Sequence, residues 1–143
     1  MKILFVMDIA MLKDVYKSKR ERLDKKTGKV VHGFKNITFD DFLEWFEHSR
    51  FNDGCFYCGI SNGQSFRLYE TRKSKTRGGK RGRRLELDRV DPELSYDSLN
   101  NIVWCCYWCN NAKSNFFSGQ EFKTIAIEIG KALNKILEES SNL

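Results

Sequence analysis

The sequence lacks the features of a secreted or membrane-bound chain. None of its apolar runs approaches the roughly 20 residues needed to span a bilayer. The apolar N-terminal stretch is interrupted by Asp8, and no small-residue cleavage site follows it, so we expect no signal peptide. Internal repeats and interior linkers are also missing. We therefore expect one domain, residues 1–143, that resides in the cytoplasm and has no membrane partner.

Histidine is scarce as well, since the chain contains only His32 and His48. His48 falls at the end of an amphipathic segment, where an imidazolium would interact favourably with a helix C-terminus. For His32 the sequence leaves two interpretations open, a surface loop residue and an active-site residue. A catalytic site in this chain that uses a histidine must therefore use one of these two residues.

Positive charge is concentrated in two segments, although the whole chain carries a formal net charge of only +6. Residues 67–84 contain nine basic residues against Glu70 alone, and residues 11–35 contain nine against three acidic residues. Two basic blocks on an otherwise acidic body favour a surface that faces phosphate groups. A single block of this kind is more often a solvated loop, so the interpretation depends on the motifs that accompany it.

Hydrophobic spacing predicts helices at both ends of the chain. Residues 2–24 have apolar residues at helical spacing and then become basic, which predicts one long helix. A turn over residues 25–29 would end it. Two capping boxes, Thr38/Asp41 and Ser118/Glu121, precede the other helical patterns. These patterns predict helices over about residues 39–49 and 119–139.

The middle of the chain predicts a small sheet. Residues 66–69 and 85–88 alternate between apolar and polar side chains, as two strands of a hairpin would, and a Gly-rich basic stretch over residues 73–84 would join them. Residues 101–104 form a further extended segment. The expected fold class is therefore α+β.

Five cysteines include two C-x2-C pairs, Cys55/Cys58 and Cys106/Cys109. In a reducing compartment such pairs bind metal more often than they form disulfides. Two of these turns supply the four thiolates of a structural zinc site, which leaves no open coordination position. Cys105 is left over; it could replace Cys106, but the spacing favours Cys106. The alternative is that all these thiols are buried core residues.

Asp88 and Asn110 are candidate ligands for a second metal. Asn110 directly follows the second cysteine pair, so a zinc clamp would hold it close to the strand that ends at Asp88. A carboxylate and an amide oxygen give only two protein ligands and leave positions for waters and a phosphate, which is typical of magnesium. An Asp at the end of a strand is also common in turns, which is the alternative interpretation.

The order of these motifs resembles the HNH, or ββα-metal, nuclease family. C-x2-C is followed by L-x-L-D-R-x-D, a tyrosine, N-x-V-x-C-C-x2-C-N and a lysine. The resemblance spans about residues 32–117 and is strongest to a zinc-clamped branch that includes a restriction enzyme. It implies a ββα-metal core with zinc knuckles over residues 51–117, flanked by a basic helical part over residues 1–50 and a C-terminal helix over residues 118–143.

The resemblance also implies an activity and its site residues. It implies a metal-dependent endonuclease of restriction, phage or mobile-element type that hydrolyses phosphodiester bonds in DNA. Asp88 and Asn110 match the ligands of the catalytic Mg²⁺ or Mn²⁺, and Asn101 matches an asparagine that braces the loop between the two strands. The structural zinc ligands are Cys55, Cys58, Cys106 and Cys109.

Arg89 stands where most members of the family have the histidine that activates water. Arginine does not give up its proton at any working pH, so it would bind the scissile phosphate or lower the pKa of a neighbouring acid. The zinc-clamped branch shares this Asp-Arg pair, and its pattern implies that a tyrosine, matched here by Tyr96, acts as the base. His32 matches a histidine that the branch has near its active site.

Double-stranded DNA is the expected partner, and an enzyme this small would act as a homodimer with one site for each strand. The competing interpretation is a zinc-stabilised nucleic-acid-binding module without catalysis, which Arg89 favours. An RNA-processing nuclease is a third possibility. The residues expected to contact phosphates, or guanine in the major groove, are Lys17, Lys19, Arg20, Arg22, Arg81, Arg83, Arg84 and Lys113.

Overall fold

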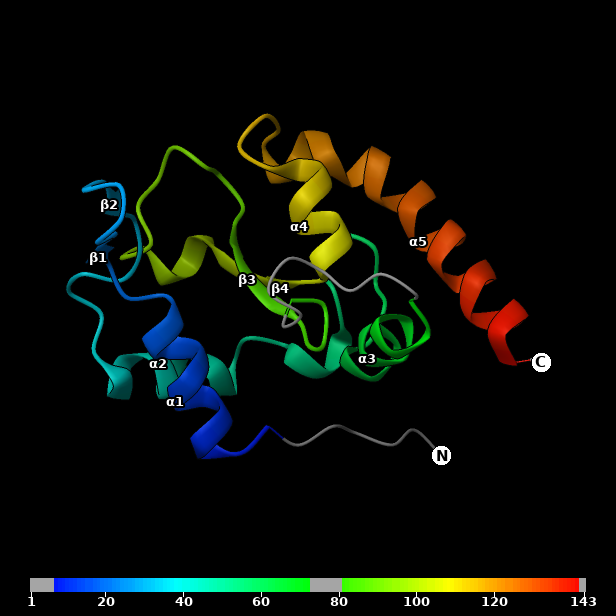
Figure 1. Ribbon diagram of the computed structural model, residues 1–143, viewed down its shortest axis with the longest axis horizontal. Coiled ribbons are helices and arrows are strands. Elements are labelled where there is room, and N and C mark those ends of the chain that lie inside the picture. The colour runs from blue at the N-terminus through cyan, green and yellow to red at the C-terminus, as the bar shows by residue number, and fades with distance from the viewer. Residues whose placement is uncertain (1–6, 73–80, 142–143) are drawn as a thin grey trace.

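The computed structural model describes residues 7–72 and 81–141 and arranges five helices of these residues around a small central sheet (Figure 1). None of these helices is both long enough and apolar enough to cross a membrane. Two 3₁₀ turns, Phe51–Asp53 and Leu99–Asn101, complete the regular structure in these ranges. The elements in chain order are α1 (Ile9–Ser18), β1 (Arg22–Leu23), β2 (Val30–Val31), α2 (Phe39–Glu47), α3 (Asn62–Thr71), β3 (Glu86–Arg89), β4 (Ile102–Cys105), α4 (Tyr107–Lys113) and α5 (Gly119–Ser141).

Helix α1 ends at Ser18, so the predicted continuous helix to residue 24 is wrong. Just after the helix, the backbone of Lys19 pairs with the segment that follows β2: Phe34 N–H donates to the Lys19 carbonyl at 2.6 Å. Gly33 permits this approach, since a Cβ there would overlap the Lys19 carbonyl. The chain then forms the short β1–β2 ribbon, whose turn contains Gly28 with a positive φ of 70°, as the expected turn over residues 25–29 requires.

An aromatic core joins α1 and α2 to the central sheet. Tyr16 of α1 stacks on Phe34 at a centroid distance of 5.7 Å, and Trp45 of α2 packs against Trp104 of β4 at 6.0 Å. The buried Trp104 donates from Nε1 to Ser49 Oγ at 2.9 Å, so its one polar atom is satisfied. The capping box at Thr38 and Asp41 starts α2 as predicted.

Residues 66–69 belong to helix α3, and the predicted strand there is wrong. Ser61 and Gln64 form a capping box that starts this helix. Ser65, Leu68 and Tyr69 are buried, and their i, i+3, i+4 spacing is helical. Part of the expected connecting stretch, residues 73–80, lies outside the described residues.

Strand β3 pairs with β4 instead, in an antiparallel register that places Asp88 opposite Val103. This confirms the extended segment predicted near residues 101–104. Helix α4 follows β4 at once, with Cys106 as its N-cap, and packs against β3. It begins three residues before Asn110, so Asn110 lies within the helix. The order β3, β4, α4 is a ββα unit.

Helix α5 packs against α3 and α4 and begins at the predicted Ser118/Glu121 capping box, in which each side chain bonds the other residue's backbone N–H. Gly130 allows the close approach of this helix to the first cysteine pair, because a Cβ there would lie 2.7 Å from the Cys58 carbonyl oxygen. The C-terminal helix therefore lies beside α4 and against the first cysteine pair (Figure 1).

The loop between β3 and β4 is tied to the segment before α2. Asp97 Oδ1 accepts from the backbone N–H groups of Lys35, Asn36 and Ile37 at 2.9, 3.0 and 3.3 Å. Burial acts to raise the pKa of Asp97, but the three donors outweigh it and hold the pKa below its usual value. This tie holds the loop in place at the residue that follows Tyr96.

Candidate active site

The four predicted zinc ligands form one cluster. The sulfur atoms of Cys55, Cys58, Cys106 and Cys109 all lie within 4.8 Å of one another, and Cys58 Sγ is 3.7 Å from Cys106 Sγ. Tetrahedral zinc with four sulfurs separates its ligands by about 3.8 Å, given a Zn–S bond of about 2.3 Å. The backbone N–H of Cys58 donates to Cys55 Sγ, and that of Cys109 donates to Cys106 Sγ, each at 3.4 Å. The cluster therefore fits a structural zinc ion.

Cys105 lies outside this cluster, as the spacing predicted. It is fully buried in β4, and burial raises the pKa of its thiol well above the usual range. Cys106 and not Cys105 belongs to the metal cluster, because its sulfur atom lies within 4.8 Å of those of Cys55, Cys58 and Cys109.

Asp88 lies near the end of β3 with one carboxylate oxygen fully engaged. Asp88 Oδ2 accepts from Tyr57 Oη at 2.6 Å and lies 3.1 Å from the Lys113 ammonium. Burial, followed by the hydrogen bond to Asp88, raises the pKa of Tyr57, which keeps its phenol protonated as a donor. Oδ1 accepts no hydrogen bond from the described residues and belongs to a side chain that lines a pocket.

Lys113 has a different place from the one that the sequence predicted. Its side chain is 1% exposed, and its ammonium group also donates to the Arg89 carbonyl at 2.9 Å. The predicted contact with a DNA phosphate is therefore incompatible with this structure, because the ammonium group points into the protein. A buried Lys next to a buried Asp balances its charge, and the loss of either partner would leave the other unpaired.

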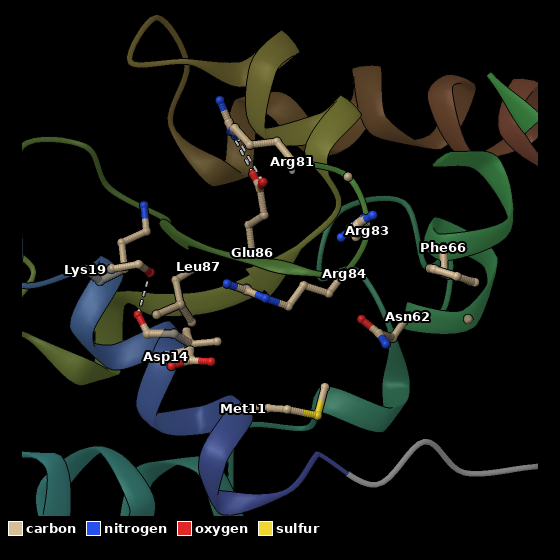
Figure 2. Close-up of a pocket in the computed structure, with 14 residues that line it drawn as sticks. Met11, Asp14, Lys19, Asn62, Phe66, Arg81, Arg83, Arg84, Glu86 and Leu87 are labelled. Atoms are coloured by element: carbon tan, nitrogen blue, oxygen red, sulfur yellow. Dashed lines mark hydrogen bonds and ion pairs between the residues drawn. The ribbon is translucent and has the colours of Figure 1, made fainter. Parts of the chain in front are cut away.

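The amide of Asn110 is oriented by a chain of polar contacts. Asn110 Nδ2 donates to Glu86 Oε1 at 3.0 Å, which leaves Asn110 Oδ1 as an acceptor. Glu86 is held in turn by a bidentate pair with Arg81, at 2.7 and 3.1 Å (Figure 2). Arg81 also lies over the ring of Tyr107 at 4.7 Å. Helix α4 thus brings an oriented amide oxygen to the pocket that Asp88 lines.

Arg89 and Tyr96 contact each other in the lining of this pocket. The Arg89 guanidinium lies 4.6 Å from the centre of the Tyr96 ring and donates to the Leu94 carbonyl at 3.1 Å. The Lys19 ammonium lies 5.5 Å from the same ring centre. The pocket has a volume of about 240 Å³ and is lined by Lys19, Arg81, Asp88, Arg89, Tyr96, Asn110, Asn111, Ser114 and Asn115.

Asn101 braces the loop that carries Tyr96, as the resemblance implied. Its side-chain oxygen accepts from Asp91 N–H at 2.9 Å, and its Nδ2 donates to the Asp91 carbonyl at 2.9 Å. Asn101 is buried and does not line the pocket. It therefore acts on the loop and not as a metal ligand.

Several predicted residues lie elsewhere. The His32 side chain is 76% exposed, with Nδ1 3.8 Å from Glu21 Oε1, and it does not line the pocket. Lys17, Arg20 and Arg22 are exposed along α1 and the start of β1, whereas Arg83 and Arg84 line a neighbouring groove. His48 is the C-cap of α2, where the sequence placed a helix-terminal cation.

The sequence interpretation missed Tyr57 and Glu86. The place of Glu86 could have been predicted from the sequence, because residues two apart on a strand point to the same face, and Glu86 is two residues before Asp88. Tyr57 lies between the two cysteines of the first pair, and only the clamp directs its hydroxyl group toward Asp88.

Comparison with known proteins points to one family. Neither protein-family models nor curated proteins give a match. A solved structure of the rare-cutting HNH restriction endonuclease PacI is similar to this chain, with a TM-score of 0.57 and 31% sequence identity, over 69% of this chain and 66% of PacI. A ββα unit, the four-cysteine cluster and this likeness agree, so the chain belongs to the HNH, or ββα-metal, nuclease family.

Proposed function

We propose that this protein is a metal-dependent endonuclease that hydrolyses phosphodiester bonds in double-stranded DNA, of restriction, phage or mobile-element type. The observation that supports this most strongly is the pocket that brings Asp88, Asn110, Arg89 and Tyr96 together from β3, α4 and the braced loop. One carboxylate oxygen and one amide oxygen suit Mg²⁺ or Mn²⁺. PacI is a DNA-cutting enzyme of the same family, which supports DNA as the substrate.

In this proposal the protein's own residues divide the chemistry among them. Asp88 and Asn110 hold the divalent cation, which when bound neutralises charge on the phosphate and the leaving oxygen. Arg89 binds a non-bridging oxygen of the scissile phosphate, since it keeps its charge throughout. Tyr96 acts as the phenolate, a charge that the neighbouring Arg89 and Lys19 cations balance, and its Oη takes the proton of the attacking water to become the neutral phenol. His32 is left as a second candidate for that proton transfer.

Exposed and half-buried cations supply affinity for the duplex. Lys17, Lys19, Arg20 and Arg22 contact the DNA backbone on one side of the pocket, and Arg81, Arg83 and Arg84 on another. A homodimer with one pocket for each strand would produce a double-strand break.

Cleavage of supercoiled plasmid and long linear phage DNA tests this function. With Mg²⁺ or Mn²⁺ the protein should give discrete fragments, and with EDTA it should give none. Asp88→Asn is the matched control, because it keeps an acceptor for Tyr57 while it removes the metal-binding charge, and it should not cut. Binding without cleavage in every condition would contradict the enzyme and favour the nucleic-acid-binding module.

Adjacent cysteines offer a matched test of the zinc clamp. Cys106→Ala should lose zinc and unfold, because the binding energy of a structural zinc is folding energy. Cys105→Ala removes a buried thiol one residue away and should retain one zinc per chain. Elemental analysis and thermal melting distinguish the two, and equal zinc content in both variants would refute the assigned ligand set.

Tyr57→Phe tests whether the clamp positions Asp88. The variant keeps the ring but removes the donor to Asp88 Oδ2, so we expect Mn²⁺ affinity and the cleavage rate each to fall about 10- to 100-fold. Tyr107→Phe is the control, because its ring contact with Arg81 does not need the hydroxyl group. Mn²⁺ binding followed by electron paramagnetic resonance should show the loss without DNA, and unchanged affinity in Tyr57→Phe would contradict the positioning role.

Tyr96→Phe tests the base. The phenylalanine ring preserves the contacts with Arg89, Lys19 and Phe34, so DNA binding should stay the same. Single-turnover cleavage should slow about 10²- to 10⁴-fold, as expected for the loss of a general base. Wild-type rates in this variant would move the search for the base to His32 or to a water molecule.

A further inference from the structure

A second hollow lies beside the active-site pocket. This groove, of about 1020 Å³, runs between α1 and the start of α3, and residues 81–84, 86 and 87 line it as well (Figure 2). Lys19 and Arg81 line both the groove and the active-site pocket. The two hollows are therefore neighbours that share a border, and a polymer bound in one can extend into the other.

The charge of the groove favours an anion. Lys19, Arg81, Arg83 and Arg84 face only two carboxylates, Asp14 and Glu86, and Glu86 already pairs with Arg81. Among the described residues, neither Arg83 nor Arg84 forms an ion pair with a carboxylate. The groove thus contains two guanidinium groups whose charge an anionic ligand could neutralise.

These two guanidinium groups are held in place before any ligand binds. Arg83 lies over the ring of Tyr69 at 5.2 Å. Arg84 donates from one nitrogen to the Leu85 carbonyl at 3.0 Å, and burial lowers its pKa. A partly desolvated cation without a carboxylate partner is stabilised by an incoming anion, and a fixed side chain loses less entropy when it binds one.

The groove also has an apolar side. Leu87 is buried in its floor, and Phe66 of α3 is 47% exposed beside the arginines. Arginines next to an exposed aromatic ring suit a nucleotide, whose phosphate is anionic and whose sugar and base offer apolar faces. A simple acidic ligand would leave Phe66 without a partner.

We propose that this groove binds the DNA strand on one side of the scissile phosphate, where Arg83 and Arg84 contact backbone phosphates and Phe66 packs against a nucleotide. The proposal rests on the proposed nuclease function, because the active-site pocket defines where the strand enters. It adds the side of the cut on which the strand is held, because the groove borders the active-site pocket where Lys19 and Arg81 lie. DNA flanking the cut on that side is bound more tightly than DNA on the other.

Salt dependence of binding tests the phosphate contacts. Affinity for plasmid fragments, without added Mg²⁺ or Mn²⁺, would be measured over a range of salt concentrations for wild type, Arg83→Gln/Arg84→Gln and the control Lys25→Gln/Lys26→Gln. Glutamine keeps most of each stem while it removes the charge, and the control removes the same charge from the exposed β1–β2 turn. Loss of two phosphate contacts should reduce the slope of log K against log salt by about 1.8 in the groove variant, and less in the control.

Photo-crosslinking tests the strand path. With a benzophenone amino acid at position 66, crosslinks should fall on one side of the mapped cut, whereas the same probe at the exposed Ile127 of α5 should give none. An unchanged salt slope in the groove variant, or crosslinks absent or spread over both sides, would overturn the groove proposal while wild type still cuts DNA. A wild-type protein that neither binds nor cuts DNA would overturn the nuclease function itself.

Discussion

Four cysteine sulfurs hold the ββα unit together, and the other features of the site depend on them. Cys55 and Cys58 come from the segment before α3, whereas Cys106 and Cys109 form the first turn of α4. The sheet between them has only two short strands, which on their own are at best marginally stable in water. A zinc ion, which the four-cysteine cluster fits, would supply the missing stability by joining the four thiolates. Helix α5 approaches the same region closely at Gly130.

The same clamp sets the electrostatics of the pocket. It places Tyr57 and Lys113 on one oxygen of Asp88, so that the carboxylate is fixed through Oδ2 while Oδ1 accepts nothing from the described residues. It also starts α4, which carries Asn110 to the Glu86–Arg81 pair that orients the amide. In the proposed metal site, two oxygen ligands would thus be positioned by partners outside the ligand set, which is how proteins commonly tune a metal site. The buried ammonium group of Lys113 balances the charge of Asp88, so no exposed cation is needed for that role.

The parts of the fold that the sequence predicted are those with local signals. Capping boxes within a few residues mark the starts of α2 and α5. The C-x2-C spacing likewise identifies the four cysteines of the metal cluster without knowledge of distant contacts. The predicted strand at residues 66–69 failed because its alternation also fits a helix, and the Ser61/Gln64 capping box decides between them. The end of α1 depends on a backbone contact between Lys19 and Phe34, which a local pattern does not contain. The burial of Lys113 was unpredictable for the same reason, because its partner Asp88 is distant in sequence and only the folded chain shows that the pair is buried.

The most direct test of this account is anomalous diffraction from crystals grown with zinc and manganese, with data collected at the absorption edge of each metal. The account predicts a zinc peak enclosed by the sulfurs of Cys55, Cys58, Cys106 and Cys109, and a separate manganese peak beside the free oxygens of Asp88 and Asn110. Zinc absent from the four sulfurs, or manganese bound away from Asp88 while the ββα unit is intact, would contradict it.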